Sequence, residues 1–182
     1  MASTNVTPSD YGLRSSAVSW GAIFAGTFMF LAIEITFGLL GTAIFASAAT
    51  PNAGHGGINA GIGIWAIVLS FIAMYLAGKT ASRLAAAPTR NNGLYHGLVT
   101  FGMSLFATVL VTALALGSTT SGNAAVGQLS NNTIVNAIAT AGWWVFFACL
   151  AGMIAAAIGG THGALGTRAR AIEPPADIRR VA

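Results

Sequence analysis

Charged side chains are scarce in this sequence. Only 7% of its 182 residues are Asp, Glu, Lys or Arg and 55% are apolar, whereas soluble globular domains have about a quarter of their residues charged. This composition excludes an ordinary soluble domain and favours a membrane protein. The net charge of +4 does not indicate nucleic-acid binding, because no stretch of the chain is long enough to form a soluble basic domain.

Cysteine and catalytic motifs are also lacking. The single cysteine, Cys149, lies inside an apolar run, which excludes a disulfide within the chain and a Cys-x-x-Cys metal or redox motif. The sequence has no Walker loop, no HExxH motif, no paired carboxylates and no nucleophile–base–acid pattern. We therefore expect neither an enzyme nor a metal site.

Long apolar runs are abundant instead. They cover about residues 17–46, 61–87, 93–117 and 134–160, and each exceeds the roughly 20 residues needed to cross a bilayer. Ala46-Ser47-Ala48 resembles a signal-peptide cleavage site, but the run before it is too long for a signal peptide, so we expect a retained helix. The sequence predicts an all-α protein with a four-helix transmembrane domain at 16–168 and polar tails at 1–15 and 169–182.

The basic residues predict the topology. They precede the first run, lie near the end of the second and the start of the third, and follow the fourth: Arg14; Lys79, Arg83 and Arg90; Arg168, Arg170, Arg179 and Arg180. The connections at about 46–60 and 118–140 carry no charged residue, and a short surface helix is predicted around Ala124–Leu129 in the second of them. Because Lys and Arg are retained on the cytoplasmic face, we expect both termini in the cytoplasm.

The four runs contain an internal repeat. A shift of 76 positions places three glycines of the first run on three glycines of the third: Gly21, Gly26 and Gly41 on Gly97, Gly102 and Gly117. A shift of 79 positions places Trp65 and Met74 of the second run on Trp144 and Met153 of the fourth. We therefore predict two duplicated helical hairpins of the same orientation, related by an axis along the membrane normal.

Two rows of small residues recur every four positions in the second and fourth runs: Ala73, Ala77, Ala81 and Ala85, and Ala148, Gly152, Ala156 and Gly160. Such a row forms a ridge almost without side chains, so another helix can approach closely. The rows predict either packing between the two hairpins or an interface between subunits.

A polar row marks the third run: His96, Thr100, Ser104, Thr108 and Thr112. Hydroxyls in membrane helices often donate to the carbonyl four residues earlier and need no other partner. The alternative is a polar pathway or a polar seam between helices.

Glu34 is the one acidic residue inside an apolar run. An ionised carboxylate near the bilayer centre is costly, so it faces protein or water, or it is protonated. The repeat aligns Glu34 with Leu110, which predicts a hydrogen bond with Thr108 or Thr112, or a symmetric contact with Glu34 of another subunit. Its role is either structural or that of a proton or cation site.

Two histidines, His96 and His162, are predicted near the cytoplasmic boundary, each followed by glycine. Two such side chains could ligate a haem between helices. The alternative is that they anchor the helices at the interface, because His162 aligns with the basic residue Arg83 of the other repeat.

Several short motifs resemble those of a widespread group of uncharacterised bacterial four-span inner-membrane proteins, some of which carry the label PhnA-like. The motifs are Ser19-Trp20-Gly21-Ala22-Ile23 with Gly26, Ala77-Gly78 through Arg83, His96-Gly97-Leu98 and Gly159-Gly160. The resemblance covers about residues 19–163 and implies the fold and the membrane location, but no activity.

Three functions are compatible with these features. The first is a non-catalytic membrane protein that forms a homo-oligomer or an accessory subunit of a larger membrane complex. The second is a small ion or proton channel or a proton-coupled transporter, which uses Glu34 with Thr108 and Thr112. The third is a membrane haem protein that uses His96 and His162; no other cofactor is expected.

Overall fold

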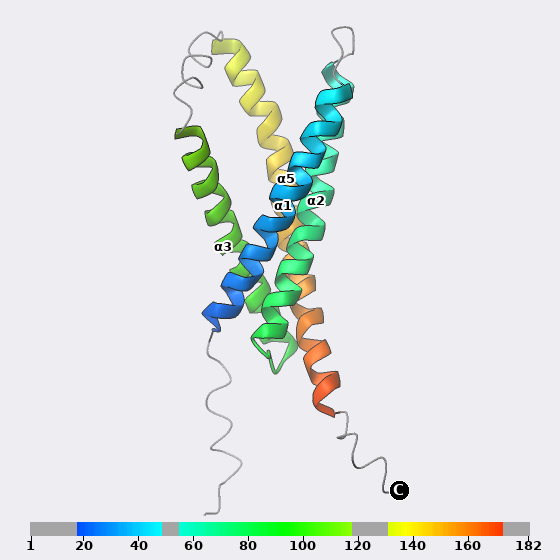
Figure 1. Ribbon diagram of the computed structural model, residues 1–182, viewed down its shortest axis with the longest axis vertical. Helices are drawn as coiled ribbons and strands as arrows, with labels where there is room; N and C mark the ends of the chain where they lie inside the picture. Colours follow the sequence, from blue (N-terminus) through cyan, green and yellow to red (C-terminus); the bar gives the residue numbers. More distant parts are fainter. Residues whose placement is uncertain (1–17, 49–54, 118–130, 173–182) are drawn as a thin grey trace, which may run out of the picture.

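Four long helices form the described part of the chain, residues 18–48, 55–117 and 131–172 of a computed structural model (Figure 1). They are α1 (Trp20–Ala48), α2 (His55–Leu84), α3 (Arg90–Gly117) and α5 (Asn131–Ile172). Each contains a segment long and apolar enough to cross a membrane. The prediction of an all-α protein with four spanning helices is therefore confirmed. The predicted tail at 1–15, the helix around Ala124–Leu129 and residues 173–182 lie outside the described residues.

The last helix extends beyond its apolar run. We expected the fourth span to end near residue 160, but α5 continues to Ile172. The residues after 160 include Ala, Leu and Arg, which favour helix, and no proline occurs before Pro174. Apolarity therefore marks the membrane segment, whereas helix propensity sets the end of the helix.

A tight turn joins α2 to α3. Ala86 has a φ of 48°, and the N–H groups of Ala86 and Ala87 donate to carbonyls of the last turn of α2, which is the Schellman ending of a helix. Thr89 then caps α3, because its hydroxyl accepts a hydrogen bond of 3.2 Å from the N–H of Asn92. This turn places the start of α3 beside the end of α2.

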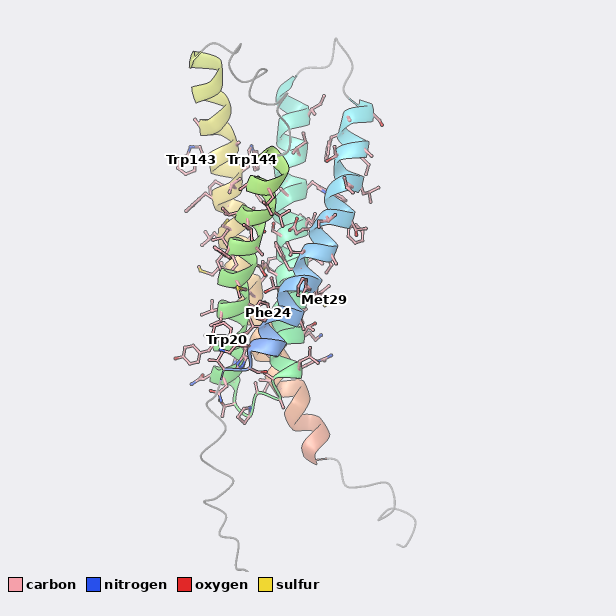
Figure 2. The ribbon with its side chains drawn as sticks, turned by 60° about the vertical axis from the view of Figure 1, so that its left-hand side comes forward. Trp20, Phe24, Met29, Trp143 and Trp144 are labelled. Carbon is pink, nitrogen blue, oxygen red and sulfur yellow. The ribbon has the colours of Figure 1, made fainter. Side chains whose placement is uncertain are left out.

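The two ends of the bundle differ in charge. Lys79 and Arg83 lie in the last turns of α2 and Arg90 begins α3, so all three lie at the end where the turn 85–89 joins these helices (Figure 1). We call this the basic end. Trp20 lies near it, whereas Trp143 and Trp144 lie toward the opposite end (Figure 2).

Glycine and alanine bring the backbones together near the basic end. Gly78 of α2 lies against the backbone of Ala156 in α5, and Gly159 of α5 lies against the backbone of Tyr75 in α2. On the other side of α5, Gly160 lies against the backbone of Gly93 in α3. α5 is therefore held between α2 and α3 by contacts in which a side chain would not fit.

The alanine row of α2 faces α1 as well. A Cβ at Gly26 of α1 would lie 2.8 Å from the carbonyl oxygen of Ala77 and 3.1 Å from the Cβ of Ala81. Ala73, Ala77 and Ala81 are completely buried. The part of each row near the basic end is thus covered by contacts within one chain.

Toward the opposite end the helices separate. α1 and α2 stay paired, because the indole N–H of Trp65 donates to the carbonyl oxygen of Phe37 over 3.3 Å and the Trp65 ring covers Gly41. In α3, by contrast, every residue from 108 to 114 is exposed, so this part of the helix has no packed face. Figure 1 shows α3 leaning away from the α1–α2 pair.

The close contacts predict opposite effects for two glycine substitutions. Gly78→Ala places a methyl group against the backbone of Ala156 and should lower the free energy of unfolding by about 1–3 kcal/mol. Gly102 of α3 has open space around it, so Gly102→Ala should leave stability unchanged or raise it by up to about 1 kcal/mol. Unfolding of the purified protein in detergent, followed by circular dichroism, compares the two. Equal losses would contradict the packing described here.

Candidate functional site

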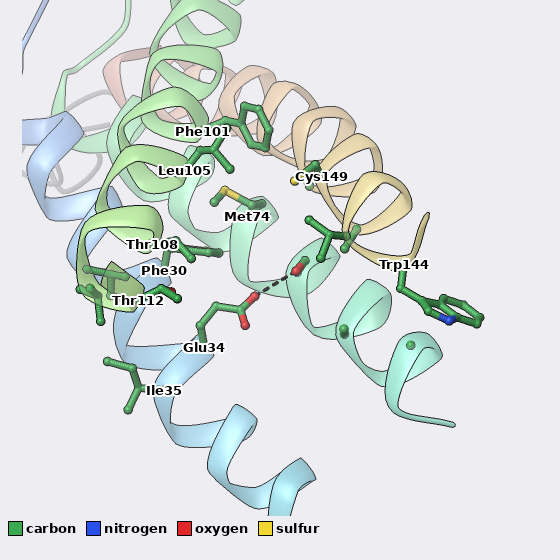
Figure 3. A pocket seen from close by; sticks show the side chains of 18 of the residues that line it. Phe30, Glu34, Ile35, Met74, Phe101, Leu105, Thr108, Thr112, Trp144 and Cys149 are labelled. Atoms are coloured by element: carbon green, nitrogen blue, oxygen red, sulfur yellow. Dashed lines mark hydrogen bonds between the residues drawn. The ribbon is translucent and has the colours of Figure 1, made fainter. Parts of the chain in front are cut away.

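Glu34 faces a cavity between the four helices. The cavity has a volume of about 840 Å³, and each helix contributes to its lining (Figure 3). Glu34 comes from the middle of α1, where Phe30, Leu31 and Ile35 also reach the cavity. Glu34 is half-buried, and no other Asp or Glu occurs among the described residues. The acidic residue that the sequence singled out therefore lies at a recess rather than within a sealed core.

The partner of Glu34 is Ser70 of α2. The Ser70 hydroxyl donates a hydrogen bond of 3.1 Å to Oε1 of Glu34, drawn as the dashed line in Figure 3. The predicted hydrogen bond with Thr108 or Thr112 is wrong. Both threonines do line the same cavity as Glu34. The repeat therefore predicted their depth in the bundle, but not the hydrogen bond.

The pairing with Ser70 follows from the α1–α2 hairpin. Glu34 and Ser70 lie equally far from position 52 in the connection between the helices, and the pairs Gly26 with Ala77 and Phe45 with Gly61 have nearly the same centre. In an antiparallel hairpin, residues equally distant from the turn lie at the same depth. Ser70 could therefore have been predicted as the partner of Glu34 from the sequence, by comparing positions within the first hairpin instead of between the two repeats.

Two of the four hydroxyls in the polar row of α3 bond to their own helix. Thr100 donates to the carbonyl oxygen of His96 over 2.7 Å, and Thr108 donates to that of Ser104 over 2.8 Å. This confirms the first of the two alternatives for these threonines. Among the described residues, the hydroxyls of Thr27 and Ser104 are buried without a hydrogen-bond partner. No chain of hydrogen bonds among the described residues links the cavity to the basic end.

The glycine and alanine contacts close the cavity toward the basic end. Its lining includes residues 30–35 of α1 and 101–112 of α3, whereas the backbone contacts at Gly26, Gly78 and Gly93 lie on the side of the basic end. Residues 108–114 of α3 are exposed, so the packing around the cavity is looser beside this segment. The close backbone contacts therefore lie on one side of the cavity, the side of the basic end.

The walls of the cavity are mainly apolar. Aromatic rings come from Phe30, Phe101 and Trp144, and Met74 lies between helices (Figure 3). Trp144 also covers Gly63 of α2, which connects α5 to the hairpin of α1 and α2 at this level. Ala148 and Gly152, which we expected in a packing interface, line the cavity, as does Cys149.

The two histidines make separate contacts. In α3, Nδ1 of His96 donates to the carbonyl oxygen of Asn92 over 2.8 Å, and Nε2 accepts from the N–H of Ser19 over 3.3 Å. Both ring nitrogens of His96 thus take part in hydrogen bonds, and ligation of a haem by His96 and His162 stays a prediction. His96 ties the start of α1 to α3.

His162 belongs to a different cluster near the basic end. Its Nδ1 lies 3.2 Å from the hydroxyl oxygen of Tyr75, and the two rings meet edge to face. The ammonium group of Lys79 lies 5.4 Å from the centre of the Tyr75 ring. His162 is exposed, so this cluster is a surface contact between α2 and α5.

Comparisons with known proteins add no function. No protein-family model, no curated protein and no solved structure matches the chain. The resemblance to the PhnA-like four-span group stays a prediction, and the function has to be inferred from the cavity itself.

The hydrogen bond between Ser70 and Glu34 predicts distinct effects of two substitutions. Ser70→Ala removes the only hydrogen bond that Glu34 makes with the described residues and should lower stability by about 0.5–1.5 kcal/mol. It should also shift the infrared carboxyl band of Glu34, which is assigned by its loss in Glu34→Gln. Thr108→Val is the matched control, because the Thr108 hydroxyl donates to Ser104. A band that responds to Thr108→Val and not to Ser70→Ala would contradict this assignment.

Proposed function

We propose that the chain is a bacterial inner-membrane protein whose basic end faces the cytoplasm and whose fold is two duplicated hairpins of the same orientation. The position of Lys79, Arg83 and Arg90 at one end supports the orientation. Contacts of Ser19 with His96 and of Gly26 with Thr100 support the duplication, because they bring α1 and α3 residues about 76 positions apart to the same depth.

Within that membrane, the cavity favours a small non-catalytic proton-coupled carrier in which Glu34 is the binding group. The observation that carries this proposal is the location of Glu34 in a cavity lined by all four helices and closed toward the basic end. A channel requires a path that is open to both sides. A carrier exposes its site to one side at a time, and binding sites near the membrane midplane are typical of carriers.

The proposed coupling of proton and substrate follows from the free-energy cost of an ionised carboxylate within the membrane. An ionised carboxylate within the membrane costs about 2.5–3.5 kcal/mol on insertion scales. Glu34 is therefore stabilised either by a bound proton or by a positively charged group in the cavity, and the two exclude each other. The contacts at Gly78 and Gly159 involve almost no interlocking side chains, which would allow one hairpin to slide against the other during exchange.

A second candidate is a homo-oligomer or an accessory subunit, the function that the sequence favoured first. Most of the small residues in the two rows are buried inside the chain and are therefore not available to a partner. The exposed segment 108–114 of α3 supports it, because a helix of a partner or of a second copy could cover this unpacked surface. In this candidate, too, the protein is non-catalytic.

The carrier proposal predicts that proton flux depends on Glu34. In liposomes loaded with a pH-sensitive dye, an imposed gradient of a cationic substrate should change the internal pH when the wild-type protein is present, whereas Glu34→Gln should give the background of empty liposomes. Cys149→Ala is the control, because Cys149 is the other titratable side chain that lines the cavity and its removal should leave the flux unchanged. Background flux in both wild type and Glu34→Gln would remove the support for a carrier.

The second candidate makes a different prediction. Native mass spectrometry of the protein, released from mild detergent, should show a dimer, a higher oligomer or a co-purifying subunit. A charged substitution in the exposed segment of α3, Val109→Lys, should reduce this species without unfolding the chain. A wild-type protein that is strictly monomeric and has no partner would exclude this candidate.

A further inference from the structure

The cavity has one kind of charge in its lining. Among the described residues that line the cavity, Glu34 is the only charged side chain, and neither Lys, Arg nor His contributes. Lys79, the nearest cation along α2, is nine residues beyond Ser70, which corresponds to about 14 Å along a helix. No basic side chain of the described residues therefore neutralises Glu34, and no ion pair is formed there.

The other walls favour a hydrophobic ligand. Rings of Phe30, Phe101 and Trp144 come from three different helices, with aliphatic side chains such as Leu105 and Val145 between them. Aromatic faces attract cations as well as apolar groups. The volume of about 840 Å³ falls in the range of sites that hold drug-sized molecules.

Other ligands fit the lining less well. A bare metal ion needs several oxygen or nitrogen ligands, and no group of three or more His, Cys, Asp or Glu occurs among the described residues. An anion would be repelled by Glu34. A neutral acyl chain would use the apolar walls but would leave the carboxylate without a counter-charge, although Ser70 donates one hydrogen bond to it.

We propose that the cavity binds a monovalent hydrophobic organic cation, whose charge lies against Glu34 and whose apolar groups contact Phe30, Phe101 and Trp144. This names the substrate class of the carrier and rests on the function proposed above. The cation and a proton compete for the same carboxyl group, so release of one accompanies binding of the other. Ser70 holds the carboxyl group toward the cavity.

Binding of two probes of the same shape and opposite charge tests the proposal. Tetraphenylphosphonium is a hydrophobic cation, and tetraphenylborate is an anion of nearly the same size. Equilibrium binding of each is measured on the full-length protein in lipid nanodiscs, with empty nanodiscs subtracted. The cation should bind at one saturable site and displace about one proton, whereas the borate should show no saturable binding.

Variants locate the site. Glu34→Gln should weaken binding of the phosphonium by about 30-fold or more, as expected for removal of one partner of a buried charge pair. Glu34→Asp keeps the charge and should retain measurable binding, which separates loss of charge from loss of folding. Trp144→Leu should weaken binding less than Glu34→Gln does. Lowering the pH should weaken binding to the wild type, because protons compete with the cation for Glu34; the other ionisable side chain among the lining residues is Cys149.

The outcomes separate this inference from the carrier function. Equal saturable binding of both probes, or binding unaffected by Glu34→Gln in a folded variant, would overturn the cation site. If binding fails while proton flux still depends on Glu34, the carrier remains and its substrate belongs to another class. If binding succeeds while no variant changes the flux, the cation site stands and the carrier function is wrong.

Discussion

Contact between the backbones of α2, α3 and α5 near the basic end is the constraint on which the rest of the structure depends. In a membrane, burial of apolar surface gives no drive for helix association, so close van der Waals packing has to supply it. Gly78, Gly93 and Gly159 allow this approach because each lies where a Cβ would meet a neighbouring backbone. Toward the opposite end, Trp65 and Trp144 occupy the space between helices. The change in side-chain size along the helices therefore creates a bundle that is closed at one end and partly open at the other.

The cavity places Glu34 where the carboxyl group has room to bind a proton or a cation in turn. A carboxylate in the closed half would be held among backbones without room for a counter-charge, whereas one at the lipid surface would be exposed to hydrocarbon. Glu34 lies between these extremes, half-buried, with Ser70 as a donor and a space of about 840 Å³ beside it. Its location thus connects the packing of the bundle to the proposed exchange of a proton for a hydrophobic cation.

The sequence predicted the helices and the depth of the site but not its contacts. Apolar runs identified four spans, because hydrocarbon tolerates few charges, and the repeat placed Glu34 near Thr108 and Thr112, which line the same cavity. The partner Ser70 was missed because the repeat compares parallel helices, whereas the partner lies across an antiparallel hairpin. The contact of His96 with Ser19, just before α1, was also missed because no sequence signal marks it. The cavity itself depends on the angles between helices, which periodicity does not encode.

The central claim is that Glu34 lies in a cavity whose closed side in this structure is the side of the basic end. The most direct measurement is labelling of Thr112→Cys, a residue of the cavity wall, in a Cys149→Ala background with a membrane-impermeant cationic thiosulfonate. The reagent is applied to sealed vesicles of either orientation, and Ser104→Cys, a completely buried position, serves as the control. The account predicts that 112 is labelled faster from the side opposite the basic end than from the side of the basic end, and that 104 is not labelled. Faster labelling of 112 from the side of the basic end, or labelling from neither side, would contradict it.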